Sequence, residues 1–313
     1  MFFSTYFLKM TKSMHVVVCS IVYKICVLNS RRTLRGSPTN LRFATQIVIM
    51  CWYLLLIFGI WIFVSFLTYR YLIQKKNLFQ KEVFFKKPSN VLFVIAHPDD
   101  ECMFFGPSIT AMVQPSLSNS SSRRKQAKDV YILCLSDGNA NGLGEARREE
   151  LKKSCKILGL ADSNVLIHNG PVFFEDSQNS VWDSKAVADT LHLYIKKLNI
   201  DSIITFDKDG ISGHLNHKSI YHGVLQLMKN SKRRVAVRVF ILETVSVLRK
   251  YLGFIDSVFI KPNALICTSD WINRTNIQNA MAAHKSQYVW FRRLYITFSR
   301  YLFFNTFIPL EIY

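Results

Sequence analysis

The sequence predicts an α/β fold: a Rossmann-like, three-layer domain with a mostly parallel sheet, preceded by a single transmembrane helix. A charge-free apolar run at residues 46–69 has the length that a membrane-spanning helix needs. From Asn90 onward, short apolar segments typical of buried strands alternate with helical segments. Clusters of polar residues follow two of these strands, where open α/β sheets bind their ligands.

The composition indicates a folded chain with a membrane segment. Its 313 residues are 50% hydrophobic and the mean hydropathy is +0.14, which is too apolar for a disordered protein. The net charge of +19 is concentrated in the flanks, because residues 1–87 hold 13 basic residues against 1 acidic and residues 229–313 hold 13 against 4. An anionic membrane surface attracts such flanks. Nucleic acid would attract them too, but no recognition motif for it is present, so we expect no nucleic-acid partner.

We expect five segments along the chain. They are a poorly ordered N-terminal extension (1–45), a transmembrane helix (46–69), a basic juxtamembrane linker (70–88), a catalytic domain (89–288) and an aromatic and basic C-terminal tail (289–313). The alternative for the apolar run is a buried core helix. Basic residues flank this run on both sides with a slight excess after it, which by the positive-inside rule favours a cytoplasmic catalytic domain.

The C-terminal tail interleaves aromatic residues with Arg292, Arg293 and Arg300. This composition suits an interfacial helix that lies against anionic lipid. The alternative is a C-terminal helix that packs on the core of the catalytic domain.

The catalytic domain is expected to alternate strands with helices. We expect strands at 90–96, 130–135, 165–167, 202–206, 235–242 and 264–267, and helices at 101–112, 144–158, 185–198 and 217–228. Residues 114–128 are polar and low in complexity and predict a loop. The alternation predicts a parallel sheet with helices on both faces.

The strongest chemical signal is the segment AHPDDE at Ala96–Glu101, where the first strand ends and a helix begins. A helix start leaves backbone N–H groups free and favours carboxylates. His97 and Asp100 are zinc-ligand types that one turn can bring together. Asp99 would lie beside the metal, where a carboxylate can take a proton from metal-bound water. A helix cap, the structural alternative, needs only one carboxylate.

The second signal is SGHLNH at Ser212–His217, which opens the helix after another strand. A catalytic zinc site usually has three protein ligands and an open position for water. His97 and Asp100 supply two, so one histidine of the pair His214 and His217 completes the set and the other is free to act on the substrate. Taken alone, this histidine pair is equally compatible with an ordinary surface pair.

Taken together, these motifs resemble the LmbE-like sugar deacetylase family. The resemblance is carried by His97–Glu101, by SDGN from Ser136 with GEAR from Gly144, and by Gly213–His217. The longer segments VIAHPDDECMFFGP and WFRRLYITFSRY resemble the eukaryotic branch, which acts on a sugar carried by phosphatidylinositol. The resemblance covers about residues 50–305.

The resemblance implies a metal site and its ligands. His97, Asp100 and His217 match the family's zinc ligands, and another divalent metal such as Fe²⁺ would suit the same residues.

The resemblance also implies the roles of three further residues. Asp99 matches the general base. His214 matches the histidine that stabilises the oxyanion or protonates the leaving amine, and Arg147 matches an arginine of the substrate cleft. Leu215 and Asn216 stand between the two histidines where soluble bacterial relatives often carry Pro-Asp.

The implied activity is zinc-dependent removal of acetate from N-acetylglucosaminyl-phosphatidylinositol, the second step of GPI-anchor biosynthesis. The implied partners are that lipid and an anionic membrane surface, and the implied place is the endoplasmic reticulum membrane with a cytoplasmic catalytic domain. Three alternatives stay open: a deacetylase of a soluble glycoside, a metal-dependent glycosyltransferase that uses Asp99–Glu101, and an inactive scaffold. Two histidines disfavour the glycosyltransferase, because Mg²⁺ and Mn²⁺ prefer oxygen ligands.

Overall fold

The computed structural model describes residues 38–74, 90–113, 129–168, 174–229, 237–261 and 264–311. Most of the expected N-terminal extension and juxtamembrane linker, and the expected loop at 114–128, lie outside the described residues. The chain divides into two compact units, Met1–Val64 and Ser65–Tyr313.

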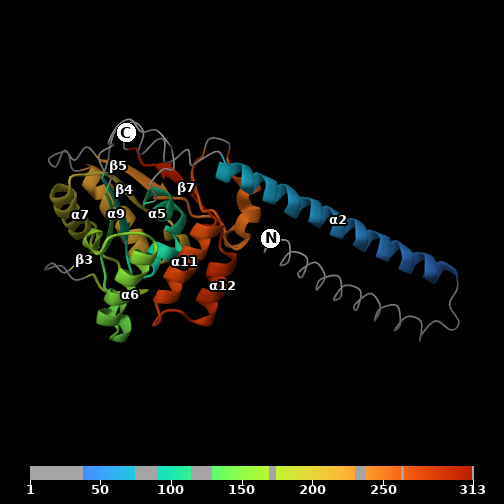
Figure 1. Ribbon diagram of the computed structural model, residues 1–313, viewed down its shortest axis with the longest axis horizontal. Coiled ribbons are helices and arrows are strands. Elements are labelled where there is room, and N and C mark those ends of the chain that lie inside the picture. The colour runs from blue at the N-terminus through green and yellow to red at the C-terminus, as the bar shows by residue number, and fades with distance from the viewer. Residues whose placement is uncertain are drawn as a thin grey trace. The chain divides into compact units, whose positions relative to one another are not determined.

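A long helix, α2, runs from Pro38 to Gln74 (Figure 1). Its part Gln46–Gln74 is the one helix in the described part of the chain that is long and apolar enough to cross a membrane. Apolar side chains along it, such as Leu54 and Ile57, are exposed, as expected for a helix that lipid would surround rather than for a buried core helix. The helix continues beyond residue 69, where the sequence-based boundary was placed.

The second unit is built on a seven-stranded sheet among the described residues. Its strands are β1 (Asn90–Ile95), β2 (Val130–Cys134), β3 (Val165–Ile167), β4 (Ile200–Phe206), β5 (Arg238–Leu242), β6 (Leu265–Thr268) and β7 (Phe304–Pro309). They lie in the order β3-β2-β1-β4-β5-β7-β6, with β1 to β5 parallel and β7 antiparallel to both of its neighbours. The predicted mostly parallel sheet is confirmed.

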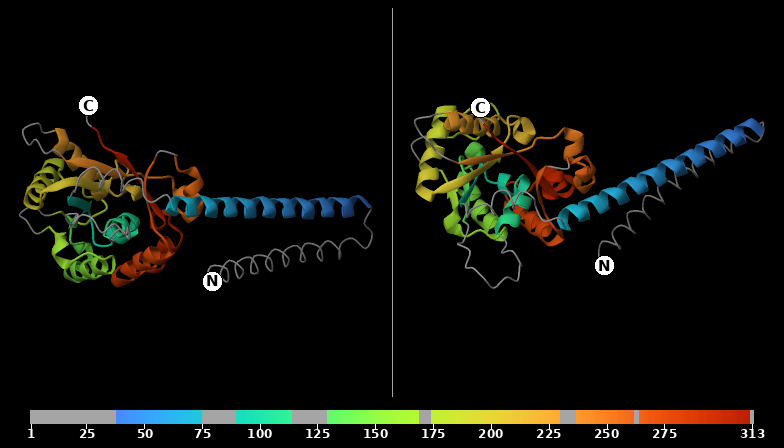
Figure 2. Two further views of the ribbon diagram at one scale, coloured as in Figure 1. Left: turned by 45° about the horizontal axis from the view of Figure 1, so that its top comes forward. Right: turned by 90° about the horizontal axis from the view of Figure 1, so that it is seen from above.

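Helices cover both faces of the sheet (Figures 1 and 2). They are α4 (Asp100–Met103), α5 (Gly106–Val113), α6 (Gly144–Ile157), α7 (Ser184–Leu198), α8 (Gly210–Gly213), α9 (Leu215–Lys229), α10 (Val247–Lys250), α11 (Trp271–Ala283) and α12 (Trp290–Phe298). The chain steps in one direction from β1 to β3 and in the other from β3 to β5. Right-handed crossovers therefore place α5 and α6 on one face and α7 and α9 on the other.

The core follows from this layering. Because both faces are covered, the strands read as continuous apolar runs rather than as alternating patterns. In β1 every residue from Val91 to Ile95 is fully buried. Each helix contributes one stripe of buried side chains to the core. In α6 this stripe includes Arg147, Leu151 and Cys155, which are four residues apart.

The C-terminal residues belong to this domain, so the boundary expected at residue 288 is wrong. Strand β7 lies between β5 and β6, and Phe307 is paired with both Leu242 and Leu265. Arg300 is fully buried, with Nη1 3.0 Å from Asp256 Oδ2 and its guanidinium over the ring of Phe304. The expectation that Arg300 faces lipid is therefore wrong, because it neutralises a buried carboxylate instead.

The last turns of α2 are part of the second unit and pack against it. The hydroxyl of Ser257 donates to the carbonyl of Ser65 at 3.1 Å. The ring of Tyr69 lies 6.2 Å from that of Phe254, in the 3-10 helix η5 (Gly253–Phe259), and its hydroxyl hydrogen-bonds to the carbonyl of Ser269. The apolar helix therefore ends in fixed contacts with the domain.

We predict that Arg300→Ala lowers the free energy of unfolding by about 3 kcal/mol, because the buried Asp256 would keep, among the described residues, only the partly exposed Arg249 as a charged partner. Arg293→Ala is the matched control and should change it by less than about 0.5 kcal/mol, since Arg293 is exposed. Thermal unfolding of the detergent-solubilised protein measures both. Equal, small effects would contradict the structural role of Arg300.

Candidate active site

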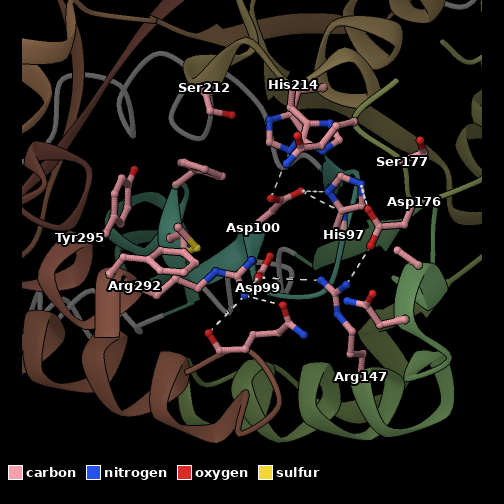
Figure 3. A pocket seen from close by; sticks show the side chains of 18 of the residues that line it. His97, Asp99, Asp100, Arg147, Asp176, Ser177, Ser212, His214, Arg292 and Tyr295 are labelled. Atoms are coloured by element: carbon pink, nitrogen blue, oxygen red, sulfur yellow. Dashed lines mark hydrogen bonds and ion pairs between the residues drawn. The ribbon is translucent and has the colours of Figure 1, made fainter. Parts of the chain in front are cut away.

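The chemical residues gather where the sheet changes direction. Strands β1 and β4 are neighbours, and the chain leaves them towards opposite edges of the sheet. Such a switch point leaves a crevice at the carboxyl ends of the strands. A cavity of about 900 Å³ lies there, and Figure 3 shows its side chains converging from both strand ends. All six predicted site residues line it, namely His97, Asp99, Asp100, Arg147, His214 and His217.

The turn after β1 is fixed by its own carboxylates. Asp100 Oδ2 accepts the backbone N–H groups of Ala96 at 3.0 Å and His97 at 2.9 Å. Asp99 has φ 121°, a conformation that costs a non-glycine residue free energy and marks functional turns. Glu101 Oε2 accepts the backbone N–H of Asp99 at 3.0 Å and so helps to hold this strained residue.

Glu101 is itself part of a buried ion pair with His284, at the end of α11. Glu101 Oε1 lies 2.7 Å from His284 Nε2 and also accepts the hydroxyl of Ser154. Both side chains are fully buried. Burial opposes both charges, yet the pairing holds the pKa of Glu101 below its usual value and the pKa of His284 above it. His284 therefore holds Glu101, and through it the backbone of Asp99, in place.

His97, Asp100 and His217 form one buried group whose ligand atoms lie within 4.8 Å of one another. His217 Nδ1 lies 3.0 Å from the carbonyl of Gly210, so this nitrogen carries the proton and Nε2 keeps a lone pair. That lone pair lies 3.3 Å from Asp100 Oδ1. A proton on Nε2 or a bound cation would satisfy these two facing atoms, and two imidazoles with one carboxylate are a donor set that fits a divalent metal.

The orientation of His97 agrees with this assignment. Its Nε2 lies 3.0 Å from Asn216 Oδ1 and 3.2 Å from Asp176 Oδ1, two acceptors that call for a proton on this nitrogen. Its Nδ1 then carries no proton, so its lone pair could bind a metal. This nitrogen lies on the side of Asp100, 3.8 Å from Asp100 Oδ2. Asn216 thus fixes the orientation of the His97 ring.

A second group, His97 with Asp176 and His214, meets the same distance criterion. Its carboxylate is already neutralised, because Arg147 Nη1 lies 2.8 Å from Asp176 Oδ2. The first group has no such arginine against its carboxylate among the described residues, so we favour it as the metal site.

Asp99 lies beside the ligand group without belonging to it. Its Oδ2 is 2.8 Å from Arg292 Nη1 and 3.8 Å from Arg147 Nη2 (Figure 3). Burial raises the pKa of Asp99, while the positive charge of Arg292 opposes the rise. A carboxylate in this setting exchanges a proton more readily near neutral pH than an ordinary aspartate.

His214 lies at the wall of the cavity and is neutral at pH 7. Burial, together with the neighbouring His97 and His217, lowers the pKa of His214 to about 4. The backbone N–H of Asn216 donates to its Nδ1 at 3.2 Å, which leaves the proton on Nε2. His214 is therefore a neutral hydrogen-bond donor.

Arg147 holds two cavity walls together. It donates to the carbonyls of Gly138 and Pro98, both at 2.9 Å, in addition to its pair with Asp176. Gly138 has φ 76°, and a Cβ there would lie 2.4 Å from the guanidinium carbon. Glycine is required at this position because the arginine occupies the space of a side chain.

The sequence did not point to several residues of this site. Asp176 lies in an irregular segment without a motif, Arg292 lies in the C-terminal region that was assigned to a tail, and Tyr295 of α12 also lines the cavity. The available signals were the adjacent arginines of WFRRLYITFSRY, whose partner cannot be read from local sequence.

Sequence comparison finds similar proteins among the de-N-acetylases. Residues 92–228 match a family described as GlcNAc-PI de-N-acetylase. A probable N-acetylglucosaminyl-phosphatidylinositol de-N-acetylase of Dictyostelium discoideum is 36% identical over 255 residues, covering 71% of this chain and 93% of its own. The N-acetylglucosaminyl-phosphatidylinositol de-N-acetylase of Bos taurus is 37% identical over 221 residues, covering 70% of this chain and 82% of its own.

Among solved structures, the fold resembles N,N'-diacetylchitobiose deacetylase from Pyrococcus horikoshii. The TM-score is 0.50 at 17% identity, and the match covers 72% of this chain and 85% of that one. This likeness supports the fold assigned above.

We predict that Gly138→Ala lowers the free energy of unfolding by about 3 kcal/mol or more, because the methyl group would displace the buried Arg147 from Asp176. Gly142→Ala is the matched control. Gly142 also has positive φ, 71°, but open space around it, so we expect a cost of about 1 kcal/mol. Chemical or thermal unfolding distinguishes them. Similar losses in the two variants would show that only backbone strain matters.

Proposed function

The chain belongs to the N-acetylglucosaminyl-phosphatidylinositol de-N-acetylase family, and we propose that it hydrolyses the N-acetyl group of N-acetylglucosaminyl-phosphatidylinositol. The products are acetate and glucosaminyl-phosphatidylinositol, and the reaction is the second step of GPI-anchor biosynthesis. The observation that carries the proposal is the buried group His97, Asp100 and His217 with Asp99 and His214 beside it in one cavity.

His97, Asp100 and His217 would hold the metal, which we propose to be zinc, with Fe²⁺ as the other candidate. Two imidazoles and one carboxylate form a ligand set of the kind that catalytic zinc sites use. When bound, a divalent ion there would make water a stronger acid and polarise the acetamide carbonyl.

The protein's own residues then move the protons. Asp99 takes a proton from the attacking water, aided by the raised pKa that burial gives it. His214 donates its Nε2–H to the carbonyl oxygen as negative charge develops, a role that a neutral imidazole can fill. Asp99 passes its proton to the glucosamine nitrogen as the C–N bond breaks, and the amine and acetate leave.

Arg147 and Asp176 would shape the sugar subsite. Arg147 lines the cavity and holds Asp176 at its wall by the 2.8 Å ion pair. The Asp176 carboxylate has acceptor capacity for sugar hydroxyls.

We also propose that the enzyme is a single-pass protein of the endoplasmic reticulum membrane with its catalytic domain in the cytoplasm. The apolar part of α2 and the basic flanks of the domain support a membrane location, and the names of the relatives support the pathway. Hydrolysis of a soluble glycoside would not require an apolar helix that can cross a membrane, so we rank that alternative second.

The deciding experiment incubates the purified full-length protein with N-acetylglucosaminyl-phosphatidylinositol and measures acetate release with and without a chelator. We expect release that the chelator abolishes and zinc restores. Turnover of a soluble N-acetylglucosaminide without turnover of the lipid would overturn the proposed substrate. Release that resists exhaustive chelation would overturn the proposed metal.

We predict that His97→Ala, Asp100→Ala and His217→Ala each lose bound metal and activity together, because each removes one of three protein ligands. His222→Ala, at an exposed position of α9, is the matched control and should keep both. Elemental analysis of the purified variants measures the metal. Full metal content in one of the three would remove that residue from the ligand set.

Asp99→Asn should keep the metal and lose about 10² to 10⁴-fold in turnover, because the amide keeps the shape of the side chain but cannot accept the proton. Metal content and turnover are measured on the same preparation. Near-normal turnover with full metal would show that another group is the base.

A further inference from the structure

Helix α12 exposes an apolar face. Trp290, Phe291, Leu294 and Phe298 are between 50% and 72% exposed. Their spacing places them along one side of the helix, while Tyr295 and Ile296 on the other side are buried in the domain. Large exposed apolar groups at this density mark an interaction surface rather than ordinary solvent-exposed protein.

The apolar face continues onto neighbouring elements. The beginning of α11 exposes Trp271 and Ile272, and α10 exposes Val247 and Leu248. These elements are in contact with α12. Arg274 of α11 donates to the carbonyl of Thr297 at 3.0 Å, and the rings of Tyr251 and Tyr295 lie 6.1 Å apart. Figure 1 shows α11 and α12 side by side. We call α12, α10 and the start of α11 the apolar surface.

The last turns of α2 contact residues next to the apolar surface. Tyr69 hydrogen-bonds to Ser269, two residues before Trp271, and its ring packs on Phe254, three residues after Tyr251. Ser65 and Tyr69, in the part of α2 that belongs to the second unit, therefore pack next to elements of the apolar surface. Because these residues continue a helix that is apolar enough to cross a membrane, a lipid bilayer is the occupant that we favour for this surface.

The charge of this region favours a lipid surface. Residues 271–310 contain no aspartate or glutamate, and Arg293 is exposed on α12 itself. An exposed arginine beside tryptophan and phenylalanine suits the boundary between lipid headgroups and acyl chains.

The same helix forms a wall of the catalytic cavity. Phe291 and Arg292 line the cavity, and Arg292 reaches Asp99 (Figure 3). On this short helix, Arg292 thus contacts the proposed base Asp99, while Trp290 and Leu294 are exposed on the outside of the domain.

We propose that the apolar surface docks on the lipid bilayer and holds the mouth of the catalytic cavity at the headgroup layer. Its catalytic consequence rests on the proposed function, since only a lipid-linked substrate gains from such placement. A lipid headgroup would then reach the cavity along α12 without leaving the membrane. A protein partner is the other occupant that such a surface would suit, and the first experiment separates the two.

The first experiment measures the depth of Trp290 in the bilayer and needs no substrate. The full-length protein is reconstituted alone into vesicles of phosphatidylcholine and phosphatidylinositol that carry brominated acyl chains, which quench nearby tryptophan fluorescence. We expect Trp290→Phe to lower the quenched fraction of the emission. Trp182→Phe, which removes a tryptophan buried within the domain, is the matched control and should raise that fraction. A quenched fraction that Trp290→Phe leaves unchanged or raises would overturn the proposal and point to a protein partner.

The second experiment tests the consequence for catalysis. Leu294→Glu and Phe298→Glu change exposed positions that do not line the cavity. We expect each to lower kcat/KM on vesicle-borne substrate at least about 10-fold, because a charge replaces buried apolar area at the bilayer. Activity on a soluble N-acetylglucosaminyl-inositol-phosphate analogue should be unchanged. Leu193→Glu, at an even more exposed apolar position on α7, is the control and should alter neither.

Equal losses on the soluble and vesicle substrates would show that these residues support the fold, and would overturn the docking role. No loss on either substrate would overturn it as well. If the protein turns over neither substrate, the proposed function fails while the quenching result still decides whether the surface meets the bilayer.

Discussion

Three consecutive carboxylates, Asp99, Asp100 and Glu101, are buried in one turn, and each is at most 3% exposed. Adjacent negative charges in a buried place are costly unless each has its own cation. Each carboxylate here has a different one. Asp99 has Arg292, Asp100 has His97 and His217, and Glu101 has His284. Much of the rest of the domain serves to bring these partners to the turn.

The partners come from widely separated parts of the chain. His217 follows β4, His284 follows α11, and Arg292 lies on α12. The elements after β5 are therefore as necessary to the site as the motif after β1. This arrangement also divides the work between similar residues, because His217 is fixed by the carbonyl of Gly210 as an acceptor whereas His214 is fixed by Asn216 as a donor.

The chemical motifs could be recognised in the sequence because each of them lies within one short stretch of the chain. The apolar run of β1, the AHPDDE turn and the histidine pair at the start of α9 each place their residues within one strand-to-helix connection, so the parallel sheet and five of the six clustered residues could be predicted from these motifs, while Arg147 came from the family resemblance. The partners of Asp99 and Glu101 could not, since Arg292 and His284 are brought in by packing between elements. Strand β7 was missed for the same reason, because its place in the sheet depends on antiparallel pairing with two distant strands.

The position of β7 has a consequence for how the protein is made. Strand β6 pairs only with β7 among the described strands, and β7 lies within the last ten residues of the chain. Until β7 has been made, β5 has one open edge and β6 has no partner strand among the described strands. This edge of the sheet therefore forms last during synthesis, and a change that removes β7 would also leave β6 unpaired.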